Sequence, residues 1–169
     1  MKAAAPTLKA RALRLLARRD YTRHELAQRL APHAADADEL EAVLDDCARR
    51  GWLDEARALE AHLHRRASAR GRARLQAELR ARGFADPALL AQADARLAAT
   101  EAERAQAAWA RRFGTAPRDA AERARQLRFL LARGFAPDVA RQVVPRLGGD
   151  GGGEHGDGNE PGGADLHAA

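Results

Sequence analysis

The apolar residues of this chain recur at the spacing of α-helices. In the stretch 54–86, pairs of leucines four positions apart place their side chains on one side of a helix, and these pairs are Leu59 with Leu63 and Leu75 with Leu79. No segment alternates apolar and polar residues as a half-buried strand would. We therefore predict an all-α protein.

Glycine–aromatic pairs punctuate the helical segments. Glycine adopts the left-handed conformation that ends many helices, and an apolar residue directly after it packs back onto the last turn. These pairs are Gly51-Trp52, Gly83-Phe84 and Gly134-Phe135. Thr22 and Glu25 have the spacing of a capping box, and Asp86 precedes a further apolar run. The punctuation predicts short helices with defined ends.

The helical pattern passes through the same order three times. Aligning the middle helices sets Leu26, Leu75 and Leu127 in equivalent places, 49 and 52 residues apart. The third middle helix is expected from about 117 to 133, and its predicted inward side chains are Ala120, Ala124, Leu127 and Leu131. Phe129 lies off this stripe, which favours packing between repeats over stacking on a nucleic-acid base.

Three units of three helices are each too small to hold a large core alone, so we expect three tandem three-helix repeats in an elongated array, straight or curved. The predicted organisation is a flexible N-terminus, 1–6, three repeats, 7–53, 54–99 and 100–147, and a disordered Gly-rich acidic tail, 148–169. The tail contains nine glycines in 22 residues and almost no apolar side chains.

Charge is distributed unevenly between the body and the tail. The tail holds five acids and neither Lys nor Arg, which leaves 29 basic and 19 acidic residues in 1–147, a formal charge of +10. A body of this charge attracts polyanions. A GC-rich coding sequence explains the abundance of arginine and alanine about equally well.

Three groups of arginines are candidate contacts to nucleic acid or to an acidic protein partner. The densest lies around Gly71 and comprises Arg65, Arg66, Arg70, Arg72 and Arg74. The second comprises Arg11, Arg14, Arg18 and Arg23, and the third, weaker group Arg123, Arg125 and Arg128. The alternative to a binding role, favoured for the densest group, is a solvent-exposed helix face stabilised by i, i+4 ion pairs such as Arg74 with Glu78.

Several functional classes find no support in the sequence. Cys47 is the only cysteine and lies on an apolar stripe, so it indicates a small buried residue. The acids Asp36, Asp38 and Glu39 fall in the first turn of a helix, where they favour the macrodipole rather than a metal. Phosphate-cradling and nucleophile motifs are absent, as is an apolar run long enough to cross a membrane. We expect a cytoplasmic protein that is not an enzyme and holds neither metal nor cofactor.

Four segments, in order and at matching spacing, resemble motifs of the RecX family, bacterial regulators of the RecA recombinase. They are Tyr21-Thr22-x-x-Glu25-Leu26, Gly51-Trp52-Leu53-Asp54-Glu55-x-Arg57, Gly71-x-x-Arg74-Leu75-x-x-Glu78-Leu79-x-x-x-Gly83 and Arg133-Gly134-Phe135. Each is weak alone, and their order makes them fairly specific. The resemblance spans about Leu8 to Leu147.

The resemblance implies a monomeric binding protein that lies in the groove of the RecA filament on single-stranded DNA. Such a protein spans neighbouring protomers and restrains ATP hydrolysis and strand exchange, in recombination, DNA repair and the SOS response. Two other classes stay open. One is a basic three-helix nucleic-acid-binding protein that does not act on RecA; the other is a helical scaffold for an unrelated protein partner.

Overall fold

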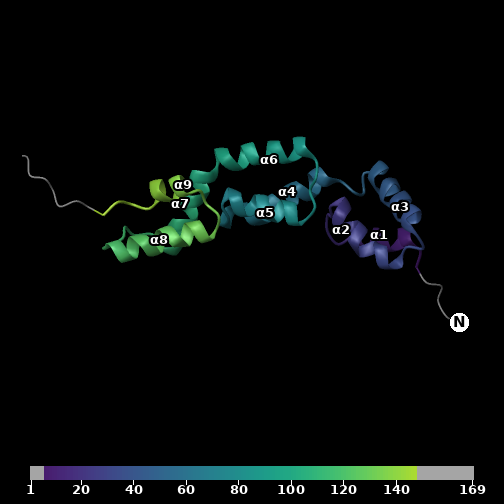
Figure 1. Cartoon of the computed structure of the whole chain (residues 1–169), viewed down its shortest axis with the longest axis horizontal. Helices are drawn as coiled ribbons and strands as arrows, with labels where there is room; N and C mark the ends of the chain where they lie inside the picture. The colour runs from purple at the N-terminus through teal and green to yellow at the C-terminus, as the bar shows by residue number, and fades with distance from the viewer. Residues whose placement is uncertain (1–5, 148–169) are drawn as a thin grey trace, which may run out of the picture.

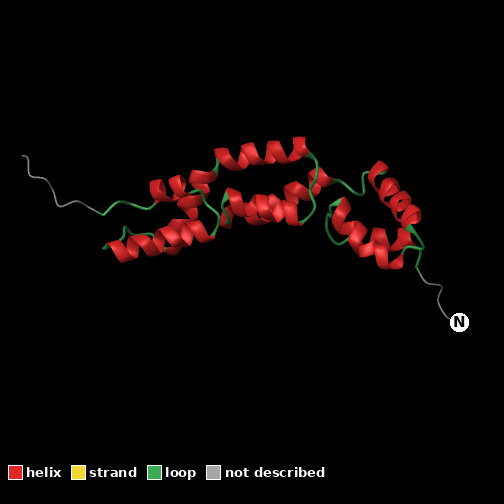
Figure 2. Ribbon diagram, in the orientation of Figure 1, coloured by secondary structure: helices red, strands yellow, loops and turns green. Residues whose placement is uncertain are grey.

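The computed structural model describes residues 6–147, and every regular element in that range is a helix (Figure 2). Residues 1–5 of the predicted flexible N-terminus, 1–6, and the predicted tail, 148–169, lie outside the described residues. The elements are α1 (Leu8–Leu16), α2 (Arg23–Leu30), η1 (Ala31–His33), α3 (Ala37–Arg49), α4 (Glu55–Arg66), η2 (Ala67–Ala69), α5 (Arg72–Ala81), α6 (Pro87–Ala99), α7 (Glu101–Arg112), α8 (Ala120–Ala132) and α9 (Pro137–Val143).

The helices group by threes along the long axis of the molecule, and each group encloses its own apolar core (Figure 1). The first core centres on Leu26, Leu30 and Leu44, the second on Leu59, Leu75 and Leu79, and the third on Trp109, Leu130 and Phe135. The predicted all-α, elongated array of three-helix repeats is confirmed. We retain 7–53, 54–99 and 100–147 as the proposed repeat boundaries, since each core lies within one of these ranges.

The helix ends follow the predicted local chemistry. Thr22 Oγ1 accepts from the Glu25 amide at 3.0 Å and Glu25 Oε2 accepts from the Thr22 amide at 3.2 Å, which is the predicted capping box. Gly83 has φ of +76°, and the amide of Phe84 donates to the Leu79 carbonyl at 3.2 Å. This bond closes the last turn of α5 and directs the Phe84 ring into the second core.

The register predicted for α8 is wrong by one residue. The buried residues of this helix are Gln126 and Leu130, whereas Leu131 is 43% exposed. Gly134 ends α8 as Gly83 ends α5, so Gln126, and not Leu127, is equivalent to Leu75. Gln126 is fully buried because its Oε1 accepts from the Trp109 indole at 2.8 Å. A polar residue at a core position misled the apolar pattern.

Phe129 packs within the third repeat. Its ring meets that of Phe113 edge to face, with centroids 5.1 Å apart, and it lies against the third core. The Arg133 guanidinium covers its ring at 3.7 Å. The expectation that Phe129 packs between repeats is therefore wrong.

The junction between repeats 1 and 2 depends on side chains. Thr22 Oγ1 donates to the Arg82 carbonyl at 2.7 Å. The Arg82 guanidinium binds both carboxylate oxygens of Glu25, at 2.9 and 2.8 Å. Burial raises the pKa of Glu25, but hydrogen bonds from Arg82, Arg19 and the Thr22 amide outweigh it and lower that pKa to about 2. The Glu25 carboxylate therefore stays charged.

The junction between repeats 2 and 3 depends on the backbone. The Gly71 amide donates to the Arg133 carbonyl at 2.8 Å, and the Ala73 amide donates to the Gly134 carbonyl at 3.2 Å. A Cβ at Gly71 would overlap the Gly134 carbonyl group and the Phe135 nitrogen, so this approach requires glycine. The end of α8 is thereby fixed against the start of α5.

Candidate functional site

An arginine-lined hollow lies where α4, η2 and α5 meet the end of α8. We call it the Arg133 hollow. Its volume is about 370 Å³, and its lining residues are Arg65, Arg66, Ala69, Arg70, Arg74, Ala132 and Arg133. Four of the five arginines predicted around Gly71 therefore share one concave surface, and a fifth cation from the third repeat joins them.

The segment η2, which lines part of this hollow, is fixed by hydrogen bonds from arginines of the third repeat. The Arg104 side chain donates to the carbonyl of Ala67 at 3.2 Å, to that of Leu97 at 2.7 Å and also to that of Arg70. Arg111 donates to the Ser68 carbonyl at 2.7 Å. Because η2 is bound to α7 in this way, the arginines that flank it project from a fixed backbone.

The hollow carries an excess of positive charge. Glu78 approaches Arg70 at 3.0 Å and Arg74 at 3.4 Å, so two cations share one carboxylate. The remaining arginines of the hollow are exposed and form no ion pair with any residue between 6 and 147, and they are Arg65, Arg66 and Arg133. Like charges held this close favour an anionic ligand.

His62 contacts Glu78 and is neutral at pH 7. Its ring is buried, and its Nε2 lies 3.3 Å from Glu78 Oε2 but forms no hydrogen bond within the described part of the chain. Burial lowers the pKa of His62, and the positive charge of Arg82 lowers it further. The neutral imidazole therefore leaves Glu78 as the acid that faces Arg70 and Arg74.

Arg72 points away from the hollow. Its guanidinium binds both oxygens of Asp94, at 2.6 and 2.7 Å, and these hydrogen bonds hold the pKa of Asp94 below its usual range. For this arginine the structure favours the interpretation of an ion-paired face. Arg74 forms the predicted i, i+4 pair with Glu78 and still lines the hollow.

The second predicted group divides in the same manner. A hollow of about 300 Å³, which we call the Arg14 hollow, is lined by Arg11, Arg14, Leu15, Arg18, Arg29, Leu30 and His33. No acid lines it. Arg23 lies elsewhere, at the start of α2, where it binds Glu41 and, at 2.6 Å, Asp45.

The third predicted group lies on α8 and is partly engaged. Arg123 donates to the Pro145 carbonyl at 3.2 Å, and Arg125 pairs with Glu122 at 3.1 Å. Arg128 is exposed. The structure brings neither Arg125 nor Arg128 to the lining of the Arg133 hollow.

Sequence reasoning missed Arg133 and Arg29 as members of the two basic surfaces. Arg133 stands in the closing Arg-Gly-Phe motif, which indicated a helix end and nothing of its surroundings. The hydrogen bond from the Gly71 amide to the Arg133 carbonyl brings Arg133 to the second repeat, although the two residues are 62 positions apart in sequence. The glycine at 71 was the only local signal of that close approach.

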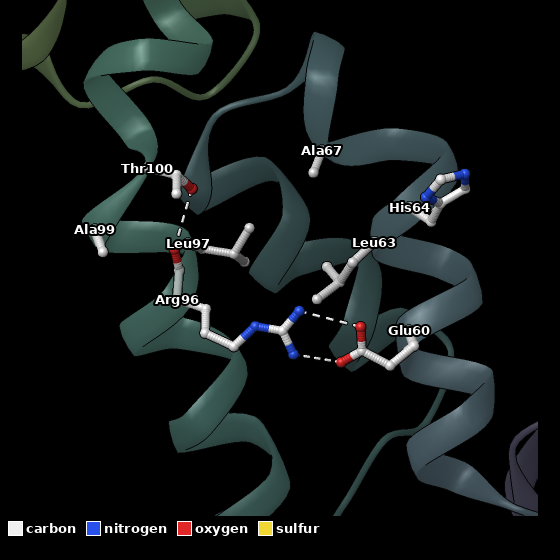
Figure 3. Close-up of a pocket in the computed structure, with 8 residues that line it drawn as sticks. All are labelled: Glu60, Leu63, His64, Ala67, Arg96, Leu97, Ala99 and Thr100. Atoms are coloured by element: carbon white, nitrogen blue, oxygen red, sulfur yellow. Dashed lines mark hydrogen bonds and ion pairs between the residues drawn. The ribbon is translucent and has the colours of Figure 1, made fainter.

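A different groove lies between α4 and α6 and is mostly apolar (Figure 3). Leu63 and Leu97 project into it, and an ion pair of Glu60 with Arg96 crosses one end. Its volume is about 450 Å³. His64 and Thr100 also line it. Glu60 is paired with Arg96, and the Thr100 hydroxyl donates to the Arg96 carbonyl at 3.0 Å, so these side chains do not form an acid–base–nucleophile set.

Two further kinds of site are absent from residues 6–147. No cluster of three or more His, Cys, Asp or Glu side chains in this range is arranged to hold a metal ion. None of the helices in the range is both long and apolar enough to cross a membrane.

The sequence matches two family models, "RecX, first three-helix domain" over residues 9–47 and "RecX, third three-helix domain" over 99–144. It is 52% identical over 138 residues to Regulatory protein RecX of Leptothrix cholodnii, covering 82% of this chain and 87% of that protein. It is 42% identical over 144 residues to the Chromobacterium violaceum protein of the same name, covering 85% and 93%.

A solved structure gives the same fold. The chain superposes on RecX from Lactobacillus salivarius with a TM-score of 0.66 at 16% identity, covering 80% of this chain and 91% of that one. The fold, the two family models and the relatives agree over the helical body. This chain belongs to the RecX family of regulatory proteins.

Proposed function

We propose that this protein binds the RecA filament on single-stranded DNA and inhibits its ATPase and recombinase activities. It acts by binding and not by catalysis, as a monomer in the cytoplasm, in recombination, DNA repair and the SOS response. The observation that carries the proposal, beside membership of a regulatory family, is the Arg133 hollow. Five arginines line it, and only two of them pair with a carboxylate, that of Glu78.

The shape of the chain supports the same proposal. Three repeats in a row expose a surface longer than any one repeat offers (Figure 1). One basic hollow is lined by repeat 1, and the other is lined mainly by repeat 2. A filament of protein and nucleic acid presents acidic side chains and phosphates along its length, and arginine binds both carboxylate and phosphate in a bidentate manner.

The direct test is the ATPase rate of RecA on single-stranded DNA with the purified protein added. We expect inhibition that saturates. A hollow-neutral variant, Arg65→Gln with Arg66→Gln and Arg133→Gln, should require about tenfold more protein for the same inhibition, because each lost charged contact weakens binding. Unchanged hydrolysis at saturating wild-type protein would contradict the proposed function.

The matched control removes three exposed arginines that lie outside both hollows and form no ion pair with a described residue. It carries Arg80→Gln, Arg112→Gln and Arg141→Gln, so its net charge equals that of the hollow-neutral variant. We expect near wild-type inhibition. Salt-dependent DNA binding without any effect on RecA would favour the basic nucleic-acid-binding protein as the function instead.

A further inference from the structure

The acidic segment and the basic body of this chain suggest a contact between them. Residues 148–169 contain Asp150, Glu154, Asp157, Glu160 and Asp165 and no Lys or Arg. The Arg133 hollow has three exposed arginines that are unpaired within residues 6–147. Opposite charges on one chain attract each other at a local concentration that linkage holds in the millimolar range.

The chain leaves its last helix beside the start of α8, within reach of the hollow at the other end of that helix. Pro145 lies beside α8, because its carbonyl accepts from Arg123 at 3.2 Å. Arg133 follows Arg123 by ten residues, which correspond to roughly 15 Å along a helix axis. The 22 residues from 148 to 169 span at most about 75 Å when fully extended, so they reach the hollow with length to spare.

The Arg14 hollow is a poorer destination. It belongs to α1, α2 and η1, in the repeat at the opposite end of the molecule from α9 (Figure 1). Reaching it requires passing the whole second repeat, whereas the Arg133 hollow is lined in part by the end of α8. The geometry therefore favours the nearer of the two basic surfaces.

We propose that residues 148–169 dock in the Arg133 hollow of the free protein and compete there with external polyanions. Carboxylates of the segment bind Arg65, Arg66 and Arg133, and a nucleic-acid backbone displaces them. The segment thus sets a threshold for binding. This inference concerns polyanion binding in general and does not depend on RecA being the partner.

Binding of a fluorescein-labelled oligo(dT) to the full chain at low salt tests the competition. A variant with Asp157→Asn, Glu160→Gln and Asp165→Asn should bind about threefold tighter or more, because exposed carboxylate–arginine contacts are individually weak and act together. The gain in affinity should shrink near 0.5 M salt, where screening limits the interaction between charges to a few ångströms.

Two further variants separate docking from a change in net charge. The first has Asp38→Asn, Glu103→Gln and Asp138→Asn, three exposed acids of the body that form no ion pair with a described residue. It should gain clearly less affinity. The second combines the segment changes with the hollow-neutral changes, and the gain should vanish there. An equal gain in the body variant, a gain that persists without the hollow arginines, or no gain at all would overturn the proposal.

A structural readout needs no nucleic acid. Cys47 is fully buried, so a spin label attaches selectively to a Gly156→Cys variant. We expect the label to broaden the backbone amide signals of Arg66, Arg74 and Arg133 in the free protein more than those of Arg14 and Arg18. Equal broadening at the two hollows, or none at either, would show that the segment does not dock at the Arg133 hollow.

Discussion

The two junctions between repeats use one arrangement with different chemistry. At both, the start of a middle helix meets the end of the next middle helix. Between repeats 1 and 2, the Thr22 hydroxyl and the Glu25–Arg82 ion pair make the contact. Between repeats 2 and 3, the amides of Gly71 and Ala73 make it directly. Because Gly71 has no side chain, the backbones of α5 and the end of α8 approach closely. The neighbouring arginines are therefore not needed for the junction and line a hollow.

A carboxylate supports each junction. It belongs to the first residue of the helix that begins the next repeat, α4 at the first junction and α7 at the second. Glu55 Oε1 accepts from the Arg23 amide at 3.0 Å, and Glu101 Oε1 accepts from the Arg72 amide at 3.1 Å. Glu101 also accepts from the Ala136 amide at 3.2 Å and is 5% exposed, whereas Glu55 is half-buried. The second junction is therefore the more tightly closed, and it is the one beside the Arg133 hollow.

The largest expected effect comes from Gly71→Ala. Its φ is −76°, so alanine fits the backbone, and the whole cost comes from overlap with the backbone of Gly134 and Phe135. We expect a loss of about 3 kcal/mol and faster hydrogen exchange at the start of α5 and the end of α8. The matched control is Gly51→Ala, which has φ of +69° and open space around it and should cost about 1 kcal/mol. Similar losses for the two would contradict the close-approach account.

The next effect compares the two supporting carboxylates. Glu101→Ala leaves two partly buried amides without an acceptor and should cost about 2–3 kcal/mol in urea unfolding. Glu55→Ala leaves one amide, that of Arg23, without an acceptor. Water reaches this amide more readily, so the change should cost about 1 kcal/mol. A larger loss for Glu55→Ala than for Glu101→Ala would reverse the ranking of the junctions.

The ion pair at the first junction predicts a dependence on pH. The folded pKa of Glu25 is about 2, below its ordinary 4.5, so its stabilisation is full above about pH 4.5 and is lost as the pH falls toward 2. Arg82→Met should cost about 2 kcal/mol at pH 7, and the difference from wild type should shrink over that window. Arg96→Met removes the exposed pair with Glu60 and should cost under about 1 kcal/mol. A pH-independent loss for Arg82→Met would show that its packing, not its charge, matters.

The smallest effect concerns Gln126, a polar residue at a core position of the third repeat. Gln126→Leu restores the residue found at Leu26 and Leu75 but leaves the Trp109 indole N–H without its acceptor. We expect a loss of about 1 kcal/mol in thermal unfolding and a shift in Trp109 fluorescence. A stabilised variant would mean that the hydrogen bond contributes nothing beyond tolerance of a polar side chain.

The sequence predicted most of the fold because its local signals agree. The capping box at Thr22 and the glycine–aromatic pair at 83–84 each determine a helix end through bonds within a few residues. The register of α8 was missed because Gln126 gains its place in the core from Trp109, a partner 17 residues away. The alignment by leucines alone therefore slipped by one residue.

The candidate site was predictable in its residue types and not in its grouping. The cluster of arginines around position 71 is visible in the sequence, but Arg72 turns to Asp94 while Arg133 arrives from another repeat. Those choices depend on contacts between helices that are far apart in the chain. Helical periodicity assigns a side chain to a face, and only the packing of repeats shows what that face meets.

Co-sedimentation with RecA filaments on single-stranded DNA tests the central claim most directly. The account predicts that wild-type protein pellets with the filaments, that the hollow-neutral variant with changes at Arg65, Arg66 and Arg133 loses most of this binding, and that the charge-matched variant at Arg80, Arg112 and Arg141 retains it. Equal pelleting of both variants would contradict the claim that the protein binds the filament through the Arg133 hollow.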